Sequence, residues 1–228
     1  MDCLLVTVKN LNIDWSLFCS FILAITAIAS CRAATKQTKI SNKQFLFEKR
    51  LTNYKSIKEL FSLYSKHKNL LRSWVIEPKD FSVVANVSID FTFLTNSGRW
   101  ESMVNVFKNY KDIDSKRTYL LKKEEFRDFI LENSFLWTFK GSKVIVDFLD
   151  SYLSLLDSLY KIEVYYQSLK ENNENSIGKL SPEDFSKYIL NCIEKTNINQ
   201  IVENLEKLYI EIKENDLISK MEKEISLK

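Results

Sequence analysis

The sequence predicts an all-α protein in which one N-terminal transmembrane helix precedes a bundle of about six to seven helices. The first observation is the stretch 15–31, which has no formally charged residue and consists mainly of Leu, Ile, Phe and Ala. The second is the scarcity of helix breakers, since the 228 residues include only 3 Gly and 2 Pro. The third is the three- and four-residue spacing of apolar residues in most of the later chain, which is typical of amphipathic helices.

The apolar stretch is long enough for a membrane anchor once its flank is included. At about 1.5 Å per residue, residues 15–31 cover roughly 26 Å, slightly less than a hydrocarbon core of about 30 Å. Leu11 and Ile13 extend the stretch, and Trp15 lies where an interfacial aromatic residue is favoured. We therefore expect a short head at 1–10, a transmembrane anchor at 11–31, a basic juxtamembrane segment at 32–46 and a helical domain at 47–228.

The charges beside the anchor predict its orientation. Only Lys9 precedes the apolar stretch as a cation, and no acidic residue follows it before Glu48. The side richer in Lys and Arg remains cytoplasmic, so we expect a single-pass protein of the cell membrane with its N-terminus outside and its C-terminal domain in the cytoplasm. The inner leaflet is anionic and attracts nearby cations. The residues expected to contact this membrane surface are Arg32, Lys36, Lys39 and Lys43.

Two other interpretations of the apolar stretch compete with the anchor. A cleaved signal sequence needs a positive start, whereas Asp2 and Asp14 offset Lys9 here. An exported lipoprotein is the stronger alternative, because Ile28-Ala29-Ser30-Cys31 resembles the bacterial lipobox and would place the lipid on Cys31. The later chain has Cys192 as its one thiol, which suits a reducing compartment better than a disulfide framework.

The first helix of the domain is expected to follow the anchor with little or no interruption. Its apolar residues recur at steps of three and four, and Pro78 ends it because proline cannot continue the hydrogen-bond ladder. The next segment, 81–94, fits both a half-buried strand and a helix. We interpret it as a helix, since a lone strand would leave its backbone groups unpaired. The stripe of the first helix consists of Phe47, Leu51, Tyr54, Ile57, Phe61, Tyr64, Leu71 and Trp74.

Shorter helices are expected at 98–110 and 116–133, and a longer one contains a helix–helix seam. The seam either forms the core of the domain or mediates self-association, and the need for a central helix favours the core. A polar loop is expected at 171–179, followed by a helix with Ser181 as N-cap and Pro182 at its first position. The last helix is expected to begin near Asn199 and to fray past Asp216. The seam consists of Ile145, Leu149, Tyr152, Leu156, Leu159 and Tyr166.

The basic charge lies close to the anchor, which also permits a nucleic-acid interpretation. Residues 32–79 hold twelve Lys or Arg against three acidic residues. Cations alternating with aromatic residues can hold a single strand by phosphate contact and base stacking. The aromatic residues of this segment share the face expected to be buried, so nucleic acid is the less favoured partner. The candidate contacts are Lys49, Arg50, Lys55 and Lys58.

The sequence offers little support for catalysis, a metal or another cofactor. His67 is the single histidine, and a metal site built on His or Cys needs several such ligands. The three glycines are too scattered for a phosphate-binding loop. We therefore expect no catalytic residue and no cofactor. The expected function is that of a non-enzymatic interaction or scaffold protein with an unidentified protein partner, which can include a second copy of the chain.

The segment ISNKQFLFEKRLTNYKSIKELFSLY, residues 40–64, carries the one resemblance to known proteins. Together with the preceding single span and basic stretch, it resembles a loose group of uncharacterised bacterial membrane-anchored helical proteins. The resemblance covers about residues 15–72 and implies the same anchored helical architecture. It implies no activity and no functional residue, and a role in a bacterial defence or envelope-associated system fits it.

Overall fold

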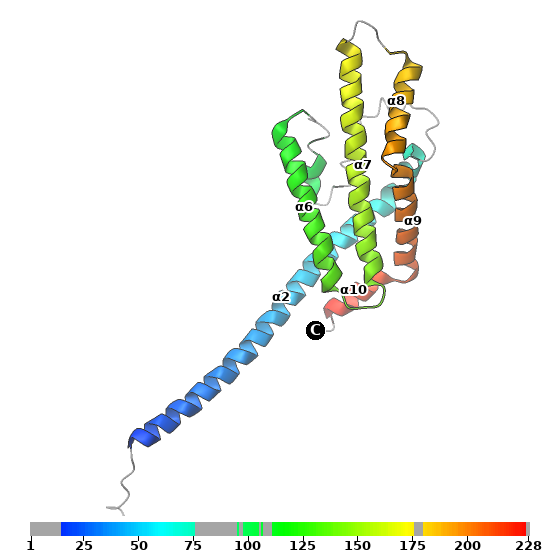
Figure 1. Ribbon diagram of the computed structural model, residues 1–228. Helices are drawn as coiled ribbons and strands as arrows, with labels where there is room; N and C mark the ends of the chain where they lie inside the picture. Colours follow the sequence, from blue (N-terminus) through cyan, green and yellow to red (C-terminus); the bar gives the residue numbers. More distant parts are fainter. Residues whose placement is uncertain are drawn as a thin grey trace, which may run out of the picture. The chain divides into compact units, whose positions relative to one another are not determined.

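The computed structural model describes residues 15–75, 95, 98–104, 106, 111–175 and 180–226 (Figure 1). Within these residues the structure contains six α-helices, one short 3₁₀ helix and no strand, which confirms the predicted all-α fold. The expected helix at 81–94 lies outside the described residues. The elements are α2 (Trp15–Val75), η1 (Glu101–Val104), α6 (Ile113–Leu136), α7 (Ser142–Asn175), α8 (Pro182–Lys195), α9 (Ile198–Glu214) and α10 (Leu217–Ser226).

Helix α2 is a single helix of 61 residues, so the expected helix of the domain continues directly from the apolar stretch. It ends at Val75, shortly before Pro78. The chain divides into two compact units, Met1–Lys49 and Arg50–Lys228, and α2 contributes residues to both. The division lies close to residue 47, where the sequence predicts the start of the helical domain.

The second unit is a helical bundle with α7 as its central helix. Helix α7 packs against α6, α8 and α9, and Figure 1 shows it between α6 on one side and the α8–α9 pair on the other. This position explains why α7 has many buried residues along its length. Aromatic side chains connect the C-terminal part of α2 to this core. The ring of Phe61 stacks on Tyr209 of α9 at 4.8 Å, and the ring of Tyr64 meets Phe148 of α7 edge-on at 5.8 Å.

Local sequence signals explain where two of the helices begin. Ser181 precedes α8 and its Oγ accepts a hydrogen bond from the backbone N–H of Asp184 at 3.1 Å, with Pro182 in the first turn. This confirms the predicted N-cap. Asp112 caps α6 in the same way and accepts from the N–H of Ser115 at 2.8 Å. A hydrogen bond from the Ser115 hydroxyl at 2.6 Å, together with this backbone one, lowers the pKa of the Asp112 carboxyl, because both favour its charged form.

Two predictions about the C-terminal half are wrong. Residues 171–175 belong to the end of α7 and not to a loop, because Glu and Asn residues do not by themselves break a helix. The chain also does not fray past Asp216. Asp216 has a positive φ of 49° between α9 and α10, and α10 then buries Leu217, Met221 and Ile225. Their four-residue spacing forms an apolar stripe that compensates for the charged residues between them.

Candidate functional site

The most distinctive surface of the first unit is the apolar part of α2, because the structure leaves it uncovered. Helix α2 contains an 18-residue window with a mean hydropathy of 1.6, and none of that window is buried. By length and composition, this is one helix that could cross a membrane. In water, each large apolar side chain left exposed forgoes roughly 1.5–3 kcal/mol of transfer free energy. The exposed side chains include Phe18, Phe21, Ile22, Leu23, Ile25 and Ile28, which are 44–67% accessible.

Two hydroxyl groups in the apolar part of α2 donate hydrogen bonds to the backbone of the same helix. Ser20 Oγ donates to the carbonyl of Ser16 at 2.7 Å, and Thr26 Oγ1 donates to that of Leu23 at 2.9 Å. Such back-bonding to the preceding turn gives a polar side chain a partner without water. In a bilayer core an unpaired hydroxyl would carry a free-energy penalty of several kcal/mol. These two hydroxyls are therefore compatible with an apolar surrounding.

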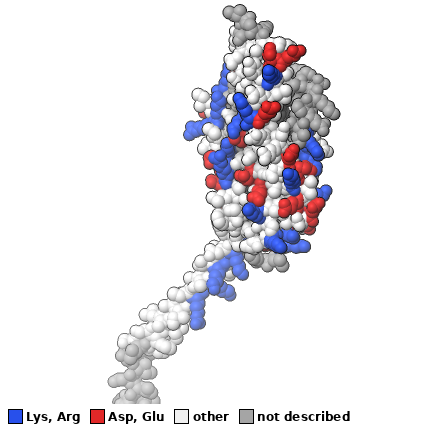
Figure 2. Space-filling model, turned by 45° about the vertical axis from the view of Figure 1, so that its right-hand side comes forward, with Lys and Arg blue, Asp and Glu red and all other residues white. Residues whose placement is uncertain are grey.

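The four predicted membrane-surface cations form one stripe directly after the apolar stretch. Arg32, Lys36, Lys39 and Lys43 follow one another at steps of four, three and four residues, which places them on one face of α2. All four are exposed. Figure 2 shows Lys and Arg side chains gathered on α2 beyond its uncharged part. We call this set the basic stripe.

The alternative lipidation residue, Cys31, lies within α2 and is exposed, as is Cys19. The helix continues without a break on both sides of Cys31, and the Cys31 carbonyl accepts a hydrogen bond from Thr35 Oγ1 at 2.8 Å. The structure thus places the lipobox-like residues inside a regular helix. In its exposure and its helical backbone, Cys31 resembles the residues beside it.

The four candidate nucleic-acid contacts do not form one surface. Lys55 and Lys58 are exposed, and Lys49 lies 6.0 Å from the ring of Phe45. Arg50, in contrast, is only 3% exposed, so its side chain does not lie on the surface with the other three cations. Lys58 also has a neighbour, because its Nζ donates to the Tyr54 hydroxyl at 3.1 Å, and this hydrogen bond raises the pKa of Lys58.

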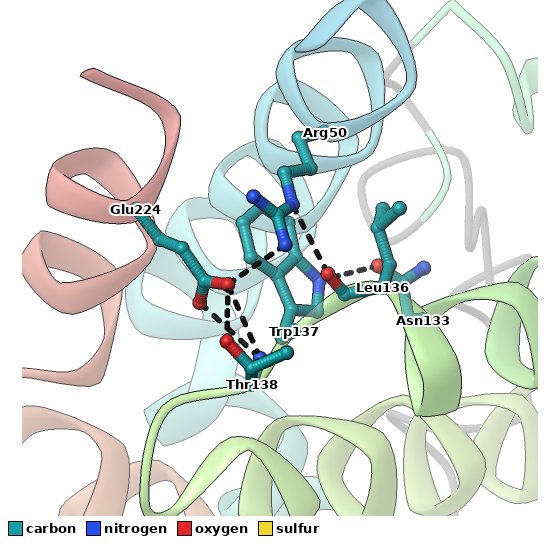
Figure 3. Close-up of polar contacts among 6 residues, drawn as sticks. All are labelled: Arg50, Asn133, Leu136, Trp137, Thr138 and Glu224. Atoms are coloured by element: carbon teal, nitrogen blue, oxygen red, sulfur yellow. Dashed lines mark hydrogen bonds and ion pairs between the residues drawn. The ribbon is translucent and has the colours of Figure 1, made fainter. Parts of the chain in front are cut away.

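Arg50 instead belongs to a buried polar cluster at the C-terminal end of α6 (Figure 3). Its Nη2 lies 2.8 Å from Oε1 of Glu224 on α10, and its Nε donates to the backbone carbonyl of Leu136 at 3.1 Å. The last carbonyl groups of a helix have no partner within the helix and form the negative end of its dipole. The Arg50 guanidinium donates a hydrogen bond to one of these carbonyl groups and places a positive charge at the negative end of the dipole. Arg50 therefore caps α6 and binds α10 at the same time.

The remaining members of the Arg50 cluster complete its hydrogen bonds. Thr138 Oγ1 donates to Glu224 at 2.7 Å, so the carboxylate has a second partner besides Arg50. Trp137 lies with its ring 6.0 Å from the Arg50 guanidinium carbon, and its Nε1 donates to Asn133 Oδ1 at 2.8 Å. The Arg50 cluster thus connects α2, α6 and α10. We name its members as Arg50, Asn133, Leu136, Trp137, Thr138 and Glu224.

The sequence did not predict this cluster, although it contains one signal of it. Arg50 lies four residues before Tyr54 and seven before Ile57, which places a cation on the buried face of α2. A buried guanidinium requires an acidic or carbonyl partner. The pattern could have predicted that such a partner exists. It could not have predicted Glu224, because that residue belongs to a segment expected to fray.

The predicted helix–helix seam lies inside the second unit. Five of its residues are at most 3% exposed, so in this fold they pack within their own unit, as the favoured interpretation expects. Tyr166 is half-buried and its ring meets Phe185 of α8 at 5.9 Å. The five buried residues are Ile145, Leu149, Tyr152, Leu156 and Leu159.

Glu163 interrupts this seam and is itself buried. It is 4% exposed, and its Oε1 accepts a hydrogen bond from Gln167 Nε2 at 2.8 Å. Burial raises the pKa of the Glu163 carboxyl, and this single hydrogen bond does not compensate for it. The pKa of Asp157, which lies on the same helix and pairs with lysines, shifts in the opposite direction. Burial also acts to raise the pKa of Asp157, but hydrogen bonds from Lys123 and Lys161 outweigh it, and the pKa lies below its usual value.

Among the residues that the structure describes, no three His, Cys, Asp or Glu side chains are grouped as a metal site would require. Between α2 and α9 there is a pocket of about 290 Å³, lined among others by Tyr64, Lys68 and Glu206. Two of its charged residues pair with each other, since Lys68 Nζ lies 2.7 Å from Glu206 Oε1. Comparisons with protein-family models, with curated proteins and with solved structures find no match for this chain.

Proposed function

We propose that this chain is a single-pass membrane-anchored protein whose helical second unit lies in the cytoplasm and acts by contacts with proteins, not by catalysis. The observation that carries the proposal is the uncovered apolar part of α2, none of which the first unit buries. A helix that is apolar on all sides has no water-facing surface. A bilayer provides the surrounding that such a helix needs.

The length and the flank of this helix favour a bilayer over an apolar protein groove. The uncharged part of α2 measures roughly 26 Å at about 1.5 Å per residue, and the basic stripe begins at the next residue, Arg32. A groove-binding helix needs only one apolar face and keeps a polar one. Here the apolar side chains surround the helix, and the charges begin where the lipid headgroups would lie.

The basic stripe supports the proposed orientation. Lys and Arg close to the end of a span remain on the cytoplasmic side, where anionic lipids contribute about 1 kcal/mol for each nearby cation. Because Arg32, Lys36, Lys39 and Lys43 share one face of α2, all four can meet the headgroups together if the helix tilts. The second unit follows the stripe in the chain and would therefore lie in the cytoplasm.

The proposed non-enzymatic role rests on how the second unit uses its charged residues. Arg50 and Glu224 bind each other and a helix end, and Asp157 binds Lys123 and Lys161. These groups stabilise the bundle, and each is occupied by a structural partner. A role in contacts between proteins uses the outer faces of the helices instead.

A topology experiment tests this proposal. A reporter fused after the last residue should resist protease in intact cells and be cleaved after the membrane is opened. Cleavage in intact cells would contradict the cytoplasmic location. Cys31→Ser is the matched control for the lipoprotein alternative, since it removes the acylation site and leaves the length of the apolar stretch unchanged. We expect this variant to remain in the membrane fraction. Neither the wild type nor this variant should incorporate a labelled fatty acid, and a label that the wild type takes up and Cys31→Ser loses would contradict the anchor.

A further inference from the structure

Helix α6 has a second apolar face that its own unit does not cover. Its buried face consists of Tyr119, Phe126, Phe129, Asn133 and Leu136, which pack toward α7 and η1. Figure 1 shows α6 at one edge of the bundle, with α7 on one side of it. A helix at the edge of a bundle normally presents polar residues to water. The outer face of α6 instead has five large apolar side chains: Ile113, Leu120, Leu121, Leu131 and Phe135.

The exposure of these side chains is high, and three of them, Ile113, Leu120 and Leu131, lie along one line of the helix surface. Ile113 and Phe135 are 78% and 79% exposed, and the three leucines are 57–59% exposed. The outer positions 113, 117, 120, 124, 127 and 131 follow steps of four and three, which is the spacing of a helix–helix contact. The other three of these positions are charged: Arg117 lies between Ile113 and Leu120, and Glu124 and Arg127 lie between Leu120 and Leu131. We call this surface the outer α6 face.

We propose that the outer α6 face binds the same face of a second copy of this chain, with the two α6 helices antiparallel. The pairing is centred between residues 125 and 126. Leu120 then lies opposite Leu131 of the second copy, and Glu124 lies opposite Arg127 of the second copy. Two-fold symmetry repeats both contacts, so each pair occurs twice.

Charge complementarity selects a second copy in this direction. In the isolated chain Glu124 and Arg127 form an ion pair within α6, and their side chains remain 64% and 53% exposed. Such an exposed pair contributes little to stability. The antiparallel arrangement surrounds these opposite charges with leucines, whereas a parallel arrangement would place Glu124 beside Glu124 and Arg127 beside Arg127. Like charges at such positions oppose association.

The size of the contact makes its strength depend on the proposed membrane anchor. Helix α6 has 24 residues and is therefore about 36 Å long. One helix on each side lies at the small end of the range for stable interfaces, near or below about 800 Å² per partner. Confinement of both copies to one membrane raises their effective concentration and favours pairing. The pairing geometry itself does not depend on the anchor.

Cross-linking of the full chain tests the geometry. The four natural cysteines are replaced by Ser, and Leu120→Cys and Leu131→Cys are introduced together. A short bis-maleimide should then yield a covalent dimer both in membranes and in concentrated detergent solution. Either single variant should yield almost none, because the antiparallel pairing separates identical positions by about 16 Å along the helix. The same distance prevents cross-linking within one helix.

A matched control measures random collision. Glu183→Cys with Glu194→Cys places two thiols at the same eleven-residue spacing on exposed positions of α8. The α6 double variant should give at least tenfold more dimer than this control. Equal yields would overturn the proposal. Cross-linking of the single Leu120→Cys variant would overturn the antiparallel geometry and favour a parallel pair.

Charge reversal tests the central pair independently. Glu124→Arg should reduce the cross-linked dimer roughly tenfold, since it places two like charges opposite each other in both halves of the contact. Adding Arg127→Glu should restore the dimer. An unchanged yield of cross-linked dimer in both variants would contradict the proposed pairing. A failure of the anchor would appear differently, as a chain found in the soluble fraction that still cross-links in concentrated solution.

Discussion

The Nη2 atom of Arg50 lies 2.8 Å from Oε1 of Glu224, although the two residues are 174 positions apart in the chain. Both side chains are nearly buried, with 4% and 12% of their surface accessible. The contact joins the first residue of the second unit to the last helix of the chain, α10. Closing so long a loop is entropically unfavourable. The Arg50–Glu224 pair therefore links the start of the second unit to α10, and its hydrogen bond and ion pair offset part of this entropic cost.

Glu224→Gln should destabilise the second unit by about 3 kcal/mol, because it leaves the buried guanidinium of Arg50 without its charge partner. Urea or thermal unfolding of the full chain in detergent, followed by tryptophan fluorescence, measures this loss. The matched control is Glu125→Gln, since Glu125 pairs with Lys122 on the exposed side of α6. That change should alter the free energy of unfolding by no more than about 0.5 kcal/mol. Equal effects of the two variants would contradict a structural role for the Arg50–Glu224 pair.

Leu156→Asp should unfold the second unit. Leu156 is 1% exposed, and an unpaired carboxylate in its place would cost several kcal/mol, comparable to the whole stability of a domain. Circular dichroism should show loss of the helical signal of the bundle. Leu190→Asp on α8 is the control, because Leu190 is 38% exposed and its replacement should leave that signal intact. A folded Leu156→Asp protein of half the mass would favour a seam between copies instead of a core.

Glu163→Gln should stabilise the protein near neutral pH. The folded state raises the pKa of Glu163, so the wild type loses stability as the pH rises from about 4.3, the usual value, through the raised one. Gln cannot ionise and keeps a hydrogen-bonding group for Gln167. The melting temperature of the variant should exceed that of the wild type at pH 7, by roughly 2–4 °C for each kcal/mol gained. Below pH 4 the two should converge.

Glu174→Gln provides the comparison for this pH dependence, since Glu174 lies on the same helix and is exposed. It should change the melting temperature little and equally at all pH values. A constant difference between Glu163→Gln and the wild type across pH 4–7 would show that ionisation of Glu163 is not the cause.

The sequence predicted the helices best where one periodic stripe decides the structure. The long uncharged stretch, the Ser181 cap and the buried α7 seam depend on neighbours in sequence, and the structure places them where local rules expect. Helix α10 depends on distant partners instead. Its charged residues suggested fraying, yet Glu224 has a buried cation from α2 as its partner. Periodicity along one helix cannot identify a contact across 174 residues.

The same limit applies to the candidate sites. Arg50 was grouped with exposed cations because it lies beside Lys49 and near Lys55, but its position on the helix turns it inward. The outer α6 face was missed because α6 has apolar residues on opposite sides, which weakens the signal of a single stripe. Only the packing of α6 against α7 reveals which of its faces is covered.

Accessibility of single cysteines to a membrane-impermeant maleimide tests the membrane anchor most directly. Cys19 lies in the apolar part of α2 and is exposed there, so in water it would react freely. With the other three natural cysteines changed to Ser, Cys19 in membranes should remain unlabelled from either side until detergent is added. Ser41→Cys, in a chain that also has Cys19 changed to Ser, should react in inverted vesicles and not in intact cells, because it lies beside the basic stripe. Labelling of Cys19 without detergent, or of Ser41→Cys from outside intact cells, would contradict the proposed anchor and its orientation.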